Sequence, residues 1–204
     1  YDPWMEKLLA ASPAAKRTVI VAAALVGAKP GDNPHLWYKP QTMPAVARAV
    51  SAALAAADPA HRAQYDANLA RFIESLKPID ARIARLRKSY AGAPVTATEP
   101  VAGYLSDAIG LSMRNTRFQL SVMNDTEPAA SDIAAFEQDL RGKRVRVLIY
   151  NAQAVSKLTE RMLALAKQAQ VPIVSVTETE PAGKTYQQWM SGQIDALAHA
   201  LGNR

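Results

Sequence analysis

The sequence contains no cysteine, which excludes a disulfide framework and any metal site built from thiolates. A chain without cysteine is compatible with an oxidising compartment such as the periplasm, although cytosolic proteins can lack cysteine too. Histidine is also scarce, with only His35, His61 and His199 in the chain. We interpret His61 and His199 as solvated side chains, because one lies at a helix start and the other near the chain end.

Long apolar runs and the common catalytic motifs are missing as well. The longest apolar run, Val19 to Val26, is far shorter than the roughly 20 residues that a membrane-spanning helix needs. There is no His-Glu-x-x-His motif, no Gly-x-Ser-x-Gly elbow and no glycine-rich phosphate loop. Serine, histidine and aspartate all occur, but no local arrangement of them marks a nucleophile. We therefore expect a protein that is not an enzyme.

A basic charge balance, with a formal net charge of +6, raises the question of a nucleic-acid partner. The lysines and arginines are scattered, and only modest clusters occur at 82–88 and 141–146. Neither cluster carries a nucleic-acid-binding motif or interleaved aromatic residues. We interpret these charges as solvated helix faces and helix ends, and we expect no binding to nucleic acid.

The tripeptide Thr-Glu-Pro occurs three times, with its glutamate at positions 99, 127 and 180. Acidic residues and proline are common where helices begin, and this explanation suits Glu127 best because a helical pattern follows it directly. Glu99 and Glu180 instead follow apolar runs that are typical of strands. A further candidate is His35, which lies in the proline-stiffened loop Asn33 to Pro40.

Up to Gly92 the pattern predicts mainly helix. A β-branched apolar run at 18–26 favours a buried strand, which is followed by the loop 27–40 that carries His35. Apolar residues then recur at helical spacing over 43–54. Asp58-Pro59 indicates the start of a second, long helix with a kink at Pro78.

Beyond Gly92 the pattern alternates between strand and helix. Strands are predicted at 94–98, 118–122, 145–150 and 171–176, and helices at 101–109, 128–140, 156–169 and 186–201. Repeated strand–helix units indicate a parallel or mostly parallel sheet covered on both faces. Ligands bind at the carboxyl ends of the strands in such sheets, which is where Glu99 and Glu180 would lie.

An imidazole combined with carboxylates suits Mn²⁺, Zn²⁺ or Fe²⁺. His35, Glu99 and Glu180 are far apart in sequence, so a metal site requires the fold to bring their loops together. Taken alone, a single loop histidine is more often a surface or hydrogen-bonded residue than a metal ligand. The residues by themselves leave both interpretations open.

Three motifs carry a resemblance to a known family. Asn33-Pro34-His35-Leu36-Trp37, then Asp58-Pro59, then Tyr65-Asp66-Ala67-Asn68 resemble the family pattern Asp-Pro-His-x-Trp, Asp-Pro and Tyr-x-x-Asn. This pattern belongs to the extracytoplasmic solute-binding proteins of manganese- and zinc-importing ABC transporters. Asn33 departs from it, since the family usually has aspartate there, and a carboxylate beside a ligating imidazole orients the ring.

The resemblance implies a ligand set of His35, Glu99 and Glu180. The third ligand of the family falls on Glu99, ahead of Gly103-Tyr104-Leu105, and the fourth falls on Glu180, with Glu178 as the weaker choice. The first histidine of the family has no counterpart in this sequence, because it lies upstream of the stretch that resembles Tyr1 to Trp4.

The fold that the resemblance implies is α/β: a two-lobed, periplasmic-binding-protein-like fold with a long linking helix and an incomplete first lobe. Residues 1–58 would form the partial amino-terminal lobe, 59–92 the linker helix and 93–204 the carboxy-terminal α/β lobe. The first residues show no secretory signal, and Met5 to Leu9 already has the pattern of an amphipathic helix. We therefore expect the chain to start inside a larger fold.

The function that the resemblance implies is the substrate-binding component of an ABC importer. It would bind a divalent transition metal ion, Mn²⁺ or Zn²⁺ with Fe²⁺ also compatible, and deliver it to the membrane permease. We expect a periplasmic monomer. Two alternatives stay open: a metal-dependent hydrolase that uses the same ligands, and an adhesin-like interaction protein on the same fold.

Overall fold

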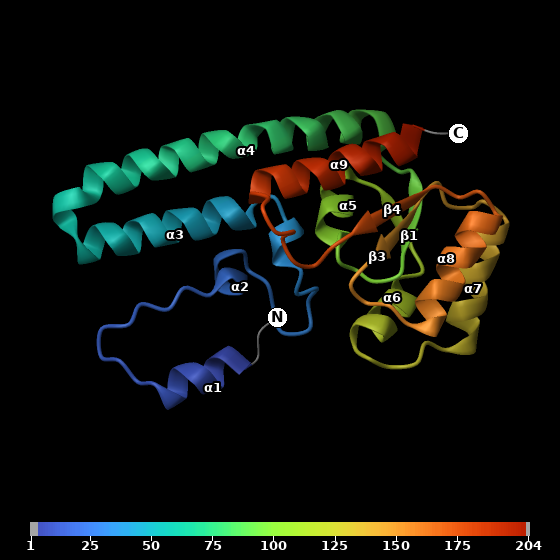
Figure 1. Cartoon of the computed structure of the whole chain (residues 1–204), viewed down its shortest axis with the longest axis horizontal. Helices are drawn as coiled ribbons and strands as arrows, with labels where there is room; N and C mark the ends of the chain where they lie inside the picture. The colour runs from blue at the N-terminus through green and yellow to red at the C-terminus, as the bar shows by residue number, and fades with distance from the viewer. Residues whose placement is uncertain (1–3, 203–204) are drawn as a thin grey trace.

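The computed structural model describes residues 4–202. An α/β part lies at one end of the molecule, and a long helical hairpin projects from it (Figure 1). Between residues 4 and 92, all regular structure is helical. Its elements are α1 (Trp4–Ala11), α2 (Ala22–Leu25), the 3₁₀ helix η1 (Leu36–Tyr38), α3 (Thr42–Ala57), the 3₁₀ helix η2 (Pro59–His61) and α4 (Arg62–Tyr90).

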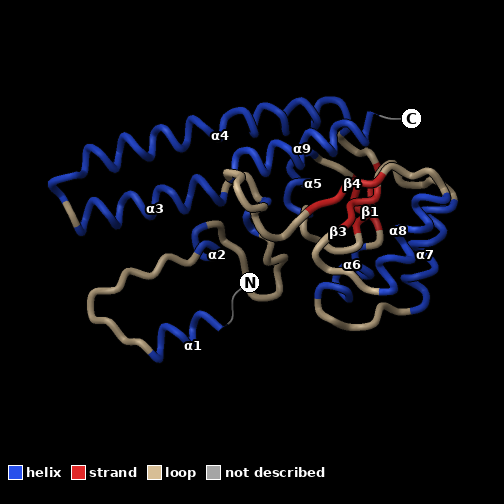
Figure 2. The backbone as a smooth tube through the Cα atoms, in the orientation of Figure 1, coloured by secondary structure: helices blue, strands red, loops and turns tan. Residues whose placement is uncertain are grey.

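In the second half, helices separate successive strands, as the sequence predicts. Its elements are β1 (Pro94–Ala97), α5 (Gly103–Ile109), β2 (Ser112–Arg114), α6 (Thr116–Met123), α7 (Ala130–Arg141), β3 (Leu148–Asn151), α8 (Lys157–Gln168), β4 (Ile173–Val176) and α9 (Tyr186–Gly202). Figure 2 shows the strands gathered at one end of the molecule, away from the tip of the hairpin.

The four strands form one parallel sheet in the order β2-β1-β3-β4. Buried side chains of α4, α5 and α9 pack on one face, and those of α6, α7 and α8 pack on the other. Adjacent strand residues alternate between the two cores: Leu148 belongs to one and Ile149 to the other. The predicted parallel sheet with helices on both faces is therefore confirmed.

The strand order creates a switch point between β1 and β3. From β1 the chain moves outward to β2, and it then returns past β1 to start β3 on the other side. In open parallel sheets a crevice forms at such a point, beyond the carboxyl ends of the strands. Here Glu99 follows β1, and Asn151 is the last residue of β3.

Helix α4 joins the hairpin to the α/β part. It packs against α3 along its first half and against α5 and α9 along its second half (Figure 1). Its buried residues Leu76, Ile79, Ile83 and Leu86 recur at intervals of three and four, and the helix continues across Pro78. Among residues 4–202, no helix is both long enough and apolar enough to cross a membrane.

The strand predicted at 18–26 is wrong. Residues 18–21 have no regular structure and residues 22–25 form α2, while Val19 and Val21 are more than half exposed. A strand requires a neighbour for its backbone hydrogen bonds. Within residues 4–202 the only sheet is the one that β1–β4 form, and this segment does not join it.

The strand predicted at 118–122 is also wrong, because these residues belong to α6. Phe118 and Gln119 are buried, whereas Leu120 is 43% exposed, which does not fit the strict alternation of a strand. The strand between α5 and α6 is β2, which the sequence analysis missed. It is a three-residue edge strand, Ser112–Arg114, without an apolar run to reveal it.

Candidate metal site

Three polar side chains meet at the carboxyl ends of β1, β3 and β4. Asn151 is 1% exposed, and its Nδ2 donates hydrogen bonds to Oε2 of Glu99 at 2.5 Å and to Oε1 of Glu178 at 2.7 Å. One amide thus holds two carboxylates that lie far apart in the sequence. The switch point of the sheet therefore presents two glutamates side by side.

Hydrogen bonds from backbone N–H groups to side-chain oxygens fix the loops that carry these residues. The Asn151 backbone N–H donates to Oγ1 of Thr98 at 3.1 Å. Oε1 of Gln153 accepts hydrogen bonds from the backbone N–H groups of Glu178 (2.7 Å) and Thr179 (3.0 Å). The loops after three neighbouring strands are thus tied to one another, which limits the movement of both glutamates.

The loop that contains η1 brings His35 to the same edge of the sheet. His35 is 2% exposed, and the centroid of its ring lies 5.4 Å from the ring centroid of Trp37 in an edge-on arrangement. Three tyrosine hydroxyls join this loop to the α/β part. They donate from Tyr38 to the Thr177 carbonyl, from Tyr104 to the Asn33 carbonyl and from Tyr186 to the Trp37 carbonyl, each at 2.8 Å.

Burial and neighbouring charges shift the titration of His35 and Glu99 in opposite directions. Burial lowers the pKa of His35, and the nearby Glu178 carboxylate opposes this change. Burial raises the pKa of Glu99, the Asn151 hydrogen bond opposes the rise, and Glu178 adds to it. Glu178 thus acts electrostatically on both groups. A lowered histidine pKa favours the neutral imidazole, which is the form that binds metal ions.

The structure brings His35 and Glu99 to one edge of the sheet but places Glu180 differently. The chain bends at residues 178–179, and Glu180 is exposed. Glu178, the weaker choice from sequence, contacts Asn151 instead. Among residues 4–202 no three histidine, aspartate or glutamate side chains are grouped closely enough to hold a metal ion as they stand. The assignment of His35, Glu99 and Glu180 as ligands stays a prediction.

Asn151 is the residue of this cluster that the sequence analysis missed. A signal was available, because Asn151 directly follows residues 145–150, which were predicted as a strand and end in the apolar run 147–150. A polar residue at the end of a buried central strand faces the crevice where ligands bind.

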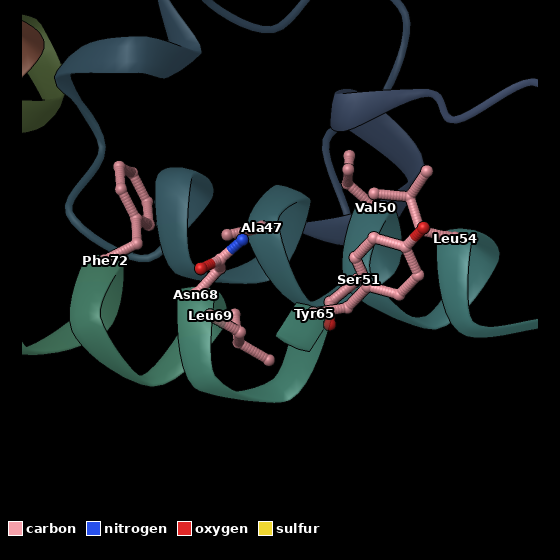
Figure 3. A pocket seen from close by; sticks show the side chains of 8 residues that line it. All are labelled: Ala47, Val50, Ser51, Leu54, Tyr65, Asn68, Leu69 and Phe72. Atoms are coloured by element: carbon pink, nitrogen blue, oxygen red, sulfur yellow. The ribbon is translucent and has the colours of Figure 1, made fainter. Parts of the chain in front are cut away.

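A separate groove lies between α3 and α4, far along the hairpin (Figure 3). Apolar side chains dominate its wall. The lining residues are Ala47, Val50, Ser51, Leu54, Tyr65, Asn68, Leu69 and Phe72. None of these is a histidine, an aspartate or a glutamate, so the groove offers none of the side chains that the predicted metal site requires.

Comparison with solved structures finds proteins with a similar fold. The solute-binding protein FpvC of Pseudomonas aeruginosa, solved with Mn²⁺, superposes with a TM-score of 0.76 at 22% identity, over 98% of this chain and 75% of FpvC. The periplasmic zinc-binding protein TroA of Treponema pallidum gives a TM-score of 0.74 at 16% identity, with the same coverage of 98% and 75%. These likenesses show the fold.

Comparison of sequences finds relatives that are described as zinc-binding, zinc-uptake or metal-transporter proteins. The zinc-binding protein AdcA of Streptococcus pyogenes is 26% identical over 172 residues, which are 81% of this chain and 32% of AdcA. The chain thus spans about a third of the length of this relative. The model of the protein family described as zinc-uptake complex component A, periplasmic, matches residues 1–200, and the chain belongs to this family.

Proposed function

We propose that the protein is the substrate-binding component of an ABC importer, which binds Zn²⁺ or Mn²⁺ outside the cytoplasm and delivers the ion to a membrane permease. The observation that carries this proposal is the pair of glutamates, Glu99 and Glu178, held at the switch point beside the buried His35 loop. Family membership supports it, as do the zinc-binding relative AdcA and the fold shared with manganese-bound FpvC.

The ligand set that we propose is His35, Glu99 and Glu178. Glu178 replaces the predicted Glu180 because Glu178 shares the Asn151 amide with Glu99 and acts electrostatically on His35. A divalent cation between the two carboxylates would take over the role of the Asn151 donor hydrogens. One nitrogen and two carboxylates suit Mn²⁺ on ligand hardness, while Zn²⁺ binds most such sites more tightly.

The same proposal includes the division into an amino-terminal lobe at 1–58, a linker at 59–92 and an α/β lobe at 93–204. The long α4, packed on α5 and α9, supports a rigid linker that permits only small changes in the angle between lobes. Release of the ion would then depend on local rearrangement of the loop around residues 177–181. We expect a monomer without catalytic activity, for which Fe²⁺ is a further compatible ion.

The test is a calorimetric titration of the chain with Zn²⁺ and, separately, with Mn²⁺. We expect one ion to bind per chain, and chelation with EDTA to reverse the binding. Failure of both ions to bind would contradict the proposal. Turnover of generic ester or phosphate substrates by the metal-loaded chain would instead favour the hydrolase alternative, which needs a general base beside the metal.

A further inference from the structure

The side chain of Asn33 uses both ends of its amide, and each end contacts a different part of the candidate metal site. Its Oδ1 lies 2.6 Å from Nδ1 of His35 and also accepts the His35 backbone N–H at 3.1 Å. Its Nδ2 donates to the carbonyl oxygen of Pro100 at 2.6 Å. Pro100 directly follows Glu99, so this one amide links the loop of His35 to the loop of Glu99.

The Pro100 contact determines which way the amide faces. A carbonyl oxygen can only accept a hydrogen bond, so the atom beside Pro100 must be the NH₂ group of Asn33. The atom beside the imidazole is then Oδ1, which is an acceptor, and Nδ1 of His35 must carry the proton. The neutral ring consequently has its lone pair on Nε2, the nitrogen that would bind a metal ion.

The absence of a side chain at Gly103 provides the room for this arrangement. A Cβ placed on Gly103 would lie 2.9 Å from Nδ2 of Asn33, closer than such atoms pack, and the next nearest atom would be Cβ of Pro100 at 4.0 Å. Gly103 is the first residue of α5 and does not need a positive φ. Its contact with Asn33 is therefore the main steric restriction at this position.

We infer that Asn33 is a positioning residue of the metal site: its oxygen selects the His35 tautomer, and its nitrogen anchors the His35 loop to the Glu99 loop in the space that Gly103 leaves. This inference rests on the proposed metal site. An aspartate at position 33, as in the family pattern, would supply the acceptor for His35 but no donor for the Pro100 carbonyl. The second link is thus a property of asparagine at this position.

The anchoring half is tested by Gly103→Ala, with Gly192→Ala as the matched control. Both glycines lie in helices, but a Cβ at Gly192 meets no atom within 4 Å. Gly103→Ala pushes the Asn33 amide away without changing its chemistry. We expect Gly103→Ala to weaken Zn²⁺ binding about tenfold, the low end of the range for partners that orient metal ligands, and Gly192→Ala to leave the affinity at the wild-type value. Equal affinities for the two variants would overturn the anchoring role.

The tautomer half is tested in the metal-free chain by the ¹⁵N chemical shifts of the His35 ring. We expect the Nδ1–H tautomer in the wild type and in Asn33→Asp, which keeps an acceptor beside Nδ1. In Asn33→Ala, which removes the acceptor, we expect a mixture of tautomers. An Nε2–H tautomer in the wild type, or an unchanged ring in Asn33→Ala, would overturn the inference.

These spectra separate this inference from the proposed function. If the wild-type chain bound neither Zn²⁺ nor Mn²⁺ but showed a pure Nδ1–H tautomer that Asn33→Ala abolishes, the tautomer selection by Asn33 would stand and the metal-receptor proposal would fail. If the wild type bound metal and the ring did not respond to Asn33→Ala, the proposed function would stand and the positioning role of Asn33 would fail.

Discussion

Glu178→Gln is expected to lower the Zn²⁺ affinity of the chain by at least about tenfold, because it removes the charge of a proposed ligand, and loss of an orienting partner alone costs roughly 10–100-fold. Glutamine keeps the shape of glutamate and can still hydrogen-bond, so the fold should persist. The measurement is a competitive titration against a chromogenic chelator, with the far-ultraviolet circular dichroism spectrum recorded as a check on folding.

The matched control is Glu180→Gln, which makes the same chemical change two residues further on. Glu180 is exposed, whereas Glu178 hydrogen-bonds to Asn151, so the control should leave the affinity essentially unchanged. The reverse result, a loss with Glu180→Gln and none with Glu178→Gln, would restore Glu180 as the ligand and refute the choice of Glu178. Unchanged affinity in both variants would refute both assignments.

The difficulty of choosing between Glu178 and Glu180 from sequence has a physical cause. In an extended segment the two residues point to the same side, because side chains alternate with a period of two. The chain instead bends at residues 178–179, where Gln153 accepts hydrogen bonds from two successive backbone N–H groups. A contact with a residue 25 positions away thus decides which glutamate faces the site, and a local sequence pattern cannot reveal that contact.

The parallel sheet was predictable largely because the continuous apolar run Val147 to Tyr150 covers most of central strand β3, which is flanked by helices with apolar stripes. The same rule fails at 18–26, where an apolar run has no neighbouring strand within residues 4–202. It also misses β2, which pairs only through its backbone at the sheet edge and has no buried residue. An apolar run thus reveals a central strand such as β3, whereas pairing with a neighbouring strand decides whether other segments join the sheet.

The second large effect is expected from Phe118→Ala, in the helix that the sequence analysis took for a strand. Phe118 and Phe136 are fully buried, and their rings meet edge to face with centroids 4.7 Å apart. Removing a buried phenylalanine leaves a cavity and costs about 3–5 kcal/mol of unfolding free energy, which is a large part of the roughly 5–15 kcal/mol that stabilises a typical domain. Urea denaturation followed by circular dichroism measures the change as a lower midpoint.

Leu120→Ala is the control, because Leu120 lies two residues further along α6 but is 43% exposed. If residues 116–123 are helical, the two positions lie on different faces of α6, and the control should change the stability by no more than about 0.5 kcal/mol. In a strand, positions 118 and 120 would share a face, and both substitutions would be costly. Comparable losses at both positions would therefore contradict the helix, whereas a loss at Phe118 alone supports it and the packing of α6 and α7 beneath the sheet.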